Sequence, residues 1–223
     1  MPSTPWLVLQ LADSAFPAGG FVHSGGLEAA AELGLVGDRP GQIPFATLAE
    51  QVTRQLGRAA LPFVGAGYDG DPPLAAADAR ADAFWVMPVA NRASRAQGRA
   101  LASVARRVWD DEPVRELGRA AAATNMHHAP FFGALGRALG LGRPDVLALF
   151  VHGAARGLVS AAVRLGLSGP IEGQRTFHAL AAAAAAAVED GAALRLDDAA
   201  QTHPLFELFG AQHERLGARL FQS

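Results

Sequence analysis

The sequence predicts an all-α protein, a single-domain bundle of about ten helices. Apolar residues recur at three- and four-residue spacing along most of the 223-residue chain, and the period-two alternation typical of strands is hard to find. The breaks between helical segments are short, so none is long enough to be an interdomain linker. A composition of 50% apolar and 18% charged residues is that of a globular protein. We therefore expect one domain over residues 1–223.

The expected helices run between breaks rich in glycine, proline and aspartate. These breaks are GDRPG at 37–41, GYDGDPP at 67–73, Pro88, DDEP at 110–113 and LGRP at 141–144. Pro88 separates two helices because proline lacks an N–H donor and disfavours helix in the residue before it. The seven alanines at 181–187 favour helix, and their small side chains predict a packed core helix. In chain order we expect helices at Trp6–Ala12, Gly26–Leu33, Ile43–Val64, Leu74–Met87, Val89–Asp110, Val114–Ala123, Ala129–Leu139, Pro144–Leu165, Glu172–Glu189 and Pro204–Phe221.

Two absences exclude whole classes of chemistry. The chain has no lysine, so it cannot hold a phosphate-loop lysine, a Schiff base or a lysine general base. It has no cysteine, which excludes a thiolate nucleophile, cysteine zinc or iron–sulfur ligation and disulfides. A formal charge of −2 gives no electrostatic case for nucleic acid or an anionic membrane. We expect neither as a partner, and no cofactor.

The stretch FPAGGFVHSGGLE, Phe16–Glu28, is the most unusual in the chain. Val22 occupies the first glycine position of a G-x-S-x-G nucleophile elbow around Ser24, so that interpretation fails. A phosphate cradle lacks the preceding strand and the following lysine. Two interpretations remain from the residues: glycines that relieve crowding in a turn while Ser24 caps the next helix, or a shaped surface for another protein.

Histidines and arginines offer no credible active site. No histidine has a partner at the i+3 or i+4 spacing of helical metal sites, and the adjacent His127 and His128 would diverge on a helix. Arg92, Arg95, Arg99 and Arg106 line one helical face, which is typical of a solvated stripe or a docking surface for an acidic partner. We expect no metal site and no catalytic residues.

The N-terminal stretch has no basic residue ahead of its short apolar run, so a secretory signal is not expected. The apolar window at 146–163 carries His152 and Arg156 near its middle and is interpreted as a buried core helix. We expect a cytoplasmic protein.

Four stretches together resemble the urease accessory protein UreF family. They are LQLADSAFPAGGFVHSGGLE at 9–28, RASRAQGRAL at 92–101, SAAVRLGLSGPIEGQR at 160–175 and QHERLGARLFQS at 212–223. Ala18, Val22 and Pro170–Ile171 depart from the residues usual in that family.

The resemblance implies an all-helical protein, usually a homodimer, that is not itself a catalyst. Its partners would be a UreG-type GTPase and a UreD/UreH-type protein, and through their complex apo-urease, to which nickel is delivered. The matching stretches supply the residues expected to contact partners: Phe21, His23, Ser24, Glu28, Gln97, Arg99, Glu172, Gln174, Arg175, His213, Glu214 and Arg219.

Two further expectations concern the glycine-rich stretch near the N-terminus and the C-terminal tail. We expect His23 and Glu28 to be polar surface residues, so that replacing either leaves the fold intact. The tail from Thr202 is crowded with large apolar side chains that need a partner, either the core of this domain or another protein. The resemblance favours the UreD-type protein, and predicts that loss of 212–223 spares most of the thermal stability. The large apolar residues of the tail are Leu205, Phe206, Leu208, Phe209, Leu216, Leu220 and Phe221.

Two other function classes stay open. One is a metal-dependent hydrolase using His127, His128 and His152; the other is a helical scaffold unrelated to urease.

Overall fold

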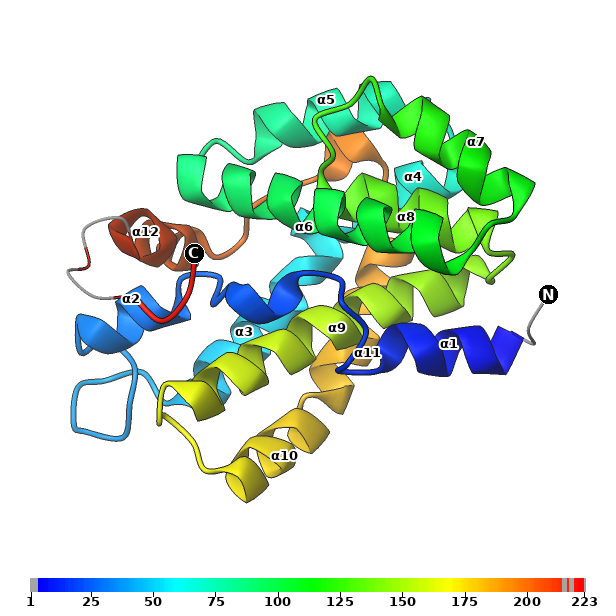
Figure 1. Cartoon of the computed structure of the whole chain (residues 1–223). Coiled ribbons are helices and arrows are strands. Elements are labelled where there is room, and N and C mark those ends of the chain that lie inside the picture. Colours follow the sequence, from blue (N-terminus) through cyan, green and yellow to red (C-terminus); the bar gives the residue numbers. More distant parts are fainter. Residues whose placement is uncertain (1–3, 214–215, 217–218, 223) are drawn as a thin grey trace.

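The computed structural model describes residues 4–213, 216 and 219–222, and these residues form an all-α fold (Figure 1). No strand occurs among them; Val36 and Ile43 make one isolated bridge. The expected fold class is confirmed. The helices are α1 (Thr4–Ala12), η1 (Gly20–Val22), α2 (Leu27–Glu32), α3 (Phe45–Ala59), α4 (Leu61–Asp69), α5 (Leu74–Phe84), α6 (Pro88–Val108), α7 (Glu112–Ala121), α8 (His128–Ala138), α9 (Arg143–Arg164), α10 (Pro170–Ala179), α11 (Ala181–Ala192), η2 (Leu196–Asp198) and α12 (Pro204–Gln212).

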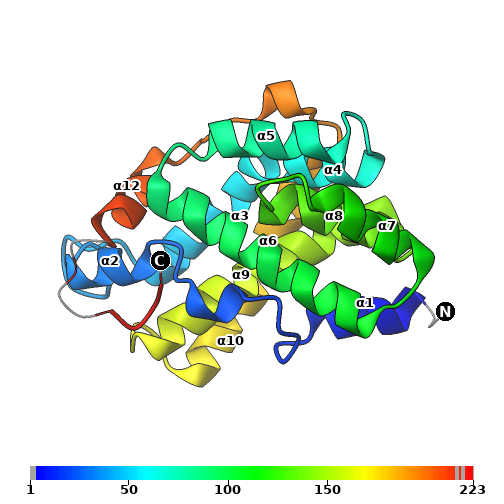
Figure 2. The same cartoon turned by 45° about the horizontal axis from the view of Figure 1, so that its top comes forward.

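Helix α9 is the centre of the bundle. It contacts α1, α3, α4, α8, α10 and α11, and the turn η1 lies against it. Its length and composition would allow it to cross a membrane, but half of its most apolar window is buried inside the fold, as expected for a core helix. In Figures 1 and 2, α5 and α10 lie on opposite sides of this bundle, and the C-terminal end lies beside α2.

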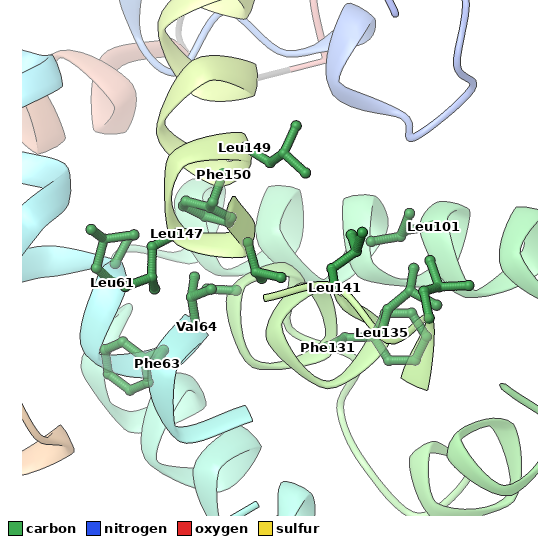
Figure 3. Packing of buried hydrophobic residues seen from close by; sticks show 14 of the residues in the cluster. Leu61, Phe63, Val64, Leu101, Phe131, Leu135, Leu141, Leu147, Leu149 and Phe150 are labelled. Carbon is green, nitrogen blue, oxygen red and sulfur yellow. The ribbon is translucent and has the colours of Figure 1, made fainter. Parts of the chain in front are cut away.

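Apolar side chains gather into two clusters around α9. The larger cluster includes Leu61 and Phe63 of α4, Leu101 of α6 and Phe131 of α8. In Figure 3, Leu61 and Phe63 lie near Val64 and Leu147, while Phe131 and Leu101 lie near Leu135. The smaller cluster joins α2, α3 and the far end of α9, and it includes Phe221 from the tail. Burying large apolar side chains contributes roughly 1.5–3 kcal/mol each, so both clusters are major sources of stability.

Glycines allow the closest helix contacts. A Cβ at Gly57 of α3 would stand 2.6 Å from the Ala187 carbonyl oxygen of α11. A Cβ at Gly133 of α8 would overlap the Val64 carbonyl oxygen of α4. Only glycine permits backbones to approach so closely. The alanine run lies on α11 and buries Ala183 and Ala187 on one face, while Ala181, Ala182 and Ala185 are exposed. The expected helix is confirmed, but it packs by one face and is not a buried core helix.

Two expected helices are each divided in the structure. The helix expected at Ile43–Val64 ends at Ala59, and α4 begins at Leu61. Pro62 is the cause, because it has no N–H to donate to the carbonyl of Arg58; the N–H of Ala200 donates to that carbonyl instead, at 3.1 Å. The helix expected at Glu172–Glu189 is interrupted at Leu180, where no glycine or proline stands.

Two other helices end earlier than expected. Helix α5 stops at Phe84, three residues before the predicted Met87. Helix α12 stops at Gln212, and the described residues 219–222 are not helical, so a helix extending to Phe221 was wrong. Glu214 and Arg215 lie outside the described residues, as do the side chains of Leu205 and Phe206.

Candidate functional site at the junction of the two chain ends

The segment Phe16–Glu28 is shaped by glycines with left-handed backbone angles. Gly19 has φ 80°, and a Cβ there would stand 2.8 Å from the Cβ of Ala100, so glycine lets the segment lie directly on α6. Gly25 and Gly26 have φ 64° and 100° and turn the chain into α2. The side chain of Ser24 accepts a hydrogen bond from the N–H of Glu28 at 3.3 Å, in the first turn of α2. The N-cap position itself is Gly26, so Ser24 satisfies a first-turn donor without being the expected cap residue.

Glu28 is the centre of the site. Its carboxylate accepts hydrogen bonds from His213 Nε2 at 2.8 Å, from the N–H of Phe221 at 3.2 Å and from the N–H of Leu220. Glu28 and Ser24 are each only 3% exposed, and His213 is fully buried. A buried carboxylate needs such donors to compensate its desolvation. The expectation that Glu28 is a surface residue is therefore wrong: it holds the tail against α2.

Arg164, at the C-terminal end of α9, makes the second attachment. Its guanidinium lies 3.9 Å from the centre of the Phe21 ring and 4.1 Å from that of Phe221, and it also donates to the Phe21 carbonyl. Such cation–π contacts each contribute about 0.5–1 kcal/mol at exposed sites. The N–H of Gln222 donates to the Val22 carbonyl at 2.8 Å. We define the end junction as Phe21–Ser24, Glu28, Arg164, His213 and Arg219–Gln222.

Histidines surround the end junction. Burial and then the nearby His213 lower the pKa of His23, which is half-buried. Burial and then His23 lower the pKa of His128 to about 4. His23 is therefore near enough to His213 and His128 for their charges to interact. His213 donates from Nε2 to Glu28, and its Nδ1 has no hydrogen-bond partner among the described residues. At neutral pH the lowered pKa values keep His23 and His128 uncharged.

The Met126–His128 segment is held by hydrogen bonds to α5 and α6. His127 is fully buried, with Nε2 3.0 Å from the Asp82 carboxylate and Nδ1 3.0 Å from the Ser94 hydroxyl. Hydrogen bonds from Asn91 and His127 lower the pKa of Asp82. His128 packs its ring against Phe132 and Phe150.

The other histidine of the hydrolase hypothesis, His152, packs on Phe177. Among the described residues no group of three His, Cys, Asp or Glu side chains is arranged to hold a metal ion.

The structure separates the twelve expected contact residues into groups. Phe21, His23, Ser24, Glu28 and His213 meet at the end junction, and the Gln97 backbone lies beside the same segment at Gly19. Phe21 is 69% exposed, and Arg219 is exposed beside Leu220. Arg99 is exposed on another face of α6, and Glu214 lies outside the described residues.

The remaining three expected residues, Glu172, Gln174 and Arg175, are exposed on α10, which packs on α9 and α11. Gln174 lines a groove of about 750 Å³ between these helices, with alanines of α11 and His152 of α9. The structure thus places these three residues on the exposed face of α10, a helix that contributes no residue to the end junction.

Sequence reasoning did not single out Arg164, although it lies within one of the resembling stretches. The sequence showed Arg164 only as a basic residue in the last turn of a long apolar helix. Such residues are common there because they interact favourably with the helix dipole, so the pattern did not indicate a contact with the tail. The pairing of Glu28 with the tail joins residues 185 or more positions apart, and no local pattern indicates it.

The fold and site define an all-helical protein in which a buried carboxylate joins the two chain ends. A family model described as UreF matches residues 45–181. The chain is 37% identical over 221 residues to the urease accessory protein UreF of Mycobacterium sp. (strain JLS), with 97% of each chain covered. It is 31% identical to the urease accessory protein F of Arabidopsis thaliana, covering 98% of this chain and 92% of the relative. Urease accessory protein F of Oryza sativa subsp. japonica is also 31% identical, with 97% and 84% covered. This chain belongs to the UreF family of urease accessory proteins.

Proposed function

We propose that this chain is a non-catalytic scaffold in urease maturation. It joins a UreG-type GTPase to a UreD/UreH-type protein, so that their complex delivers nickel, the cargo, to apo-urease. We further propose that it works as a homodimer in the cytoplasm. The observation that carries this proposal is similarity to UreF proteins over nearly the whole chain, which includes both ends that form the end junction.

The end junction supports a scaffold role because it has a buried layer and an exposed layer. Glu28, His213 and Ser24 form the buried layer and fix the tail to α2. Phe21 and Arg219 are exposed above it. Large exposed aromatic side chains on a rigid support are typical anchors of protein interfaces. We assign direct contact with the UreD-type protein to the exposed layer, and positioning of that layer to Ser24, Glu28 and His213.

The other expected residues belong to further contact surfaces in this proposal. Glu172, Gln174 and Arg175 are exposed on α10, which contributes no residue to the end junction. We assign them to a different partner, the UreG-type GTPase or the second copy of the chain. Two separate surfaces are what a bridging protein needs to hold two partners at once.

A pull-down with the cognate UreG-type GTPase and UreD-type protein tests the proposal. The wild-type chain should retain both partners together. Phe21→Ala should lose the UreD-type protein and keep the GTPase, because Phe21 is exposed and its loss leaves the core intact. Val86→Ala is the control, since Val86 is an apolar residue that is 71% exposed in the turn between α5 and α6 and is not one of the expected contacts.

Failure of the wild-type chain to retain either purified partner would contradict the bridging role. Robust hydrolysis by the purified chain, lost in His127→Ala or His152→Ala, would support the hydrolase alternative instead. For the hydrolase alternative the structure offers no supporting arrangement among the described residues.

A further inference from the structure

A second surface lies between α6, α7 and α8, where a cleft of about 300 Å³ opens at the protein surface. We define the cationic cleft by six of its lining residues: Arg99, Ser103 and Arg106 of α6, Val114 and Gly118 of α7, and Phe131 of α8. Arg99, Ser103 and Arg106 recur at four and three residues, so they share one face of α6.

The floor of the cationic cleft is apolar. Val114 and Phe131 are each 3% exposed and belong to the larger core cluster. Gly118 forms part of the wall, and a Cβ at this position would meet no atom within 4 Å. A side chain from outside could therefore enter over Gly118 and rest on the apolar floor.

The rim of the cationic cleft carries two exposed arginines without an acidic neighbour. In the described part of the chain, no carboxylate lies within ion-pair distance of Arg99 or Arg106. Two acids of the adjacent segment are already engaged: Glu112 pairs with Arg115 and Arg119, and Asp110 pairs with Arg115. The two guanidinium groups therefore remain available to an external anion.

We propose that the cationic cleft binds an acidic segment of a partner protein. One carboxylate of the segment pairs with Arg99 and another with Arg106, and an apolar side chain between them enters over Gly118. Arg99 and Arg106 are seven residues apart, which separates their positions by about 10 Å along the helix axis. That spacing and the apolar floor favour two carboxylates flanking an apolar side chain over a single phosphate group. The planar guanidinium suits a carboxylate.

This proposal does not depend on the role in urease maturation, because it concerns a surface distinct from the end junction and α10. It would add a third contact face to the molecule. An acidic segment of any cellular protein with the stated chemistry would satisfy it.

Nuclear magnetic resonance titration of the full chain tests the proposal. The probe is a capped synthetic peptide with two glutamates flanking leucine and phenylalanine, beside a second peptide with glutamine in place of glutamate. We expect the acidic peptide to shift the backbone amide signals of Ser103 and Gly118, and the glutamine peptide to bind about tenfold more weakly, as the loss of two exposed ion pairs implies.

Variants separate charge from shape. Arg99→Glu with Arg106→Glu should abolish the shifts, whereas Arg107→Glu should preserve them, because Arg107 makes the same charge change on the same helix but does not line the cleft. Gly118→Leu should fill the cleft and block the peptide, while Gly118→Ala should leave most binding intact. Circular dichroism checks that each variant is folded, and Arg106→Gln provides a milder charge loss if a double variant fails to fold.

Three outcomes would overturn the proposal. These are no shift at Ser103 and Gly118 with the acidic peptide, equal binding of both peptides, or binding that Gly118→Leu leaves unchanged. Adenosine monophosphate is titrated in parallel as a phosphate probe. Shifts at the same amides with this nucleotide, and none with the acidic peptide, would make the cleft an anion site of another class.

Discussion

Glu28 illustrates how one residue can link parts of the chain that sequence analysis treats separately. It lies in the glycine-rich segment, yet its three hydrogen-bond donors all come from the tail. From the sequence, its polarity and its place at the start of a helix suggested a surface residue. The prediction failed because burial depends on the tail folding back over α2, a contact that no local pattern contains.

Replacing Glu28 by Gln should loosen the tail. The amide keeps the size of the side chain but loses the charge and one acceptor, so donors on the tail remain unsatisfied. We expect a loss of about 2 kcal/mol in the free energy of unfolding, with faster amide hydrogen exchange at Leu220 and Phe221. Glu32→Gln is the matched control because Glu32 is exposed at the end of the same helix. Equal stability and equal hydrogen exchange in Glu28→Gln and Glu32→Gln would contradict the conclusion that Glu28 holds the tail against α2.

The lowered pKa of His128 makes the free energy of unfolding depend on pH. Its pKa in the folded state is about 4, below its ordinary value of 6.5, so the unfolded chain takes up a proton first as pH falls. The free energy of unfolding should therefore decrease from pH 6.5 to pH 4, by at most about 3 kcal/mol for this residue.

Denaturant unfolding at pH 7 and pH 5 measures this effect. His128→Phe should reduce the difference between the two pH values, since phenylalanine suits the contacts with Phe132 and Phe150 but does not titrate. His178→Gln serves as the control because His178 is exposed on α10. If the difference in stability between pH 7 and pH 5 is the same in His128→Phe as in the wild type, His128 is not its source. The pKa of His23 is also lowered, so His23 should account for part of the pH dependence that remains in His128→Phe.

At the scale of elements, the sequence predicted helices well and some of their ends poorly. Breaks at glycine- and proline-rich stretches were found because those residues disfavour helix directly. Pro62 also disfavours helix, but the predicted helix at Ile43–Val64 ran across it because the apolar pattern continues on both sides. At Leu180 no breaker stands, so only tertiary packing distinguishes α10 from α11. The close pairing of α4 with α8 was not predicted, because a glycine inside a helix does not reveal which backbone it faces.

The tail is an element whose role the structure revises. The sequence favoured a tail that docks on another protein and can be removed with little loss of stability. Phe221 is instead 4% exposed in the smaller core cluster, and its ring stacks on Arg164. The expectation that the apolar side chains need cover holds for Phe221, but Leu208 and Leu220 are 50% and 56% exposed. The described part of the tail, at Phe221, finds that cover within its own domain.

Removing residues 212–223 should therefore destabilise the protein. The truncation removes Phe221 from the core and leaves the Glu28 carboxylate buried without its donors. Phe221→Ala alone should cost about 3 kcal/mol, the usual loss for a buried phenylalanine. Leu220→Ala should cost far less, since Leu220 is 56% exposed. Thermal unfolding of the three variants measures these effects, and a truncated chain that melts at the wild-type temperature would show that the tail contributes nothing to the core.

At the scale of the whole molecule, the proposed scaffold depends on the end junction being closed. A partner that binds only the closed form stabilises the folded protein in proportion to its concentration, by about 2.7 kcal/mol at a hundred times its Kd. If a variant leaves the junction partly open, the apparent affinity falls by the fraction that remains closed. Stability and partner binding are therefore coupled more strongly through Glu28 than through Phe21.

This coupling distinguishes the two layers of the end junction. With the UreD-type protein as partner, Glu28→Gln should lower both the Tm of the free chain and the affinity for the partner. Phe21→Ala should lower the affinity while changing the Tm of the free chain by less, because it removes an exposed ring and one cation–π contact. Calorimetric titration beside thermal unfolding measures both quantities. Wild-type affinity in both variants would mean that the UreD-type protein binds elsewhere, whereas wild-type affinity in Phe21→Ala alone would restrict the contact to the tail itself.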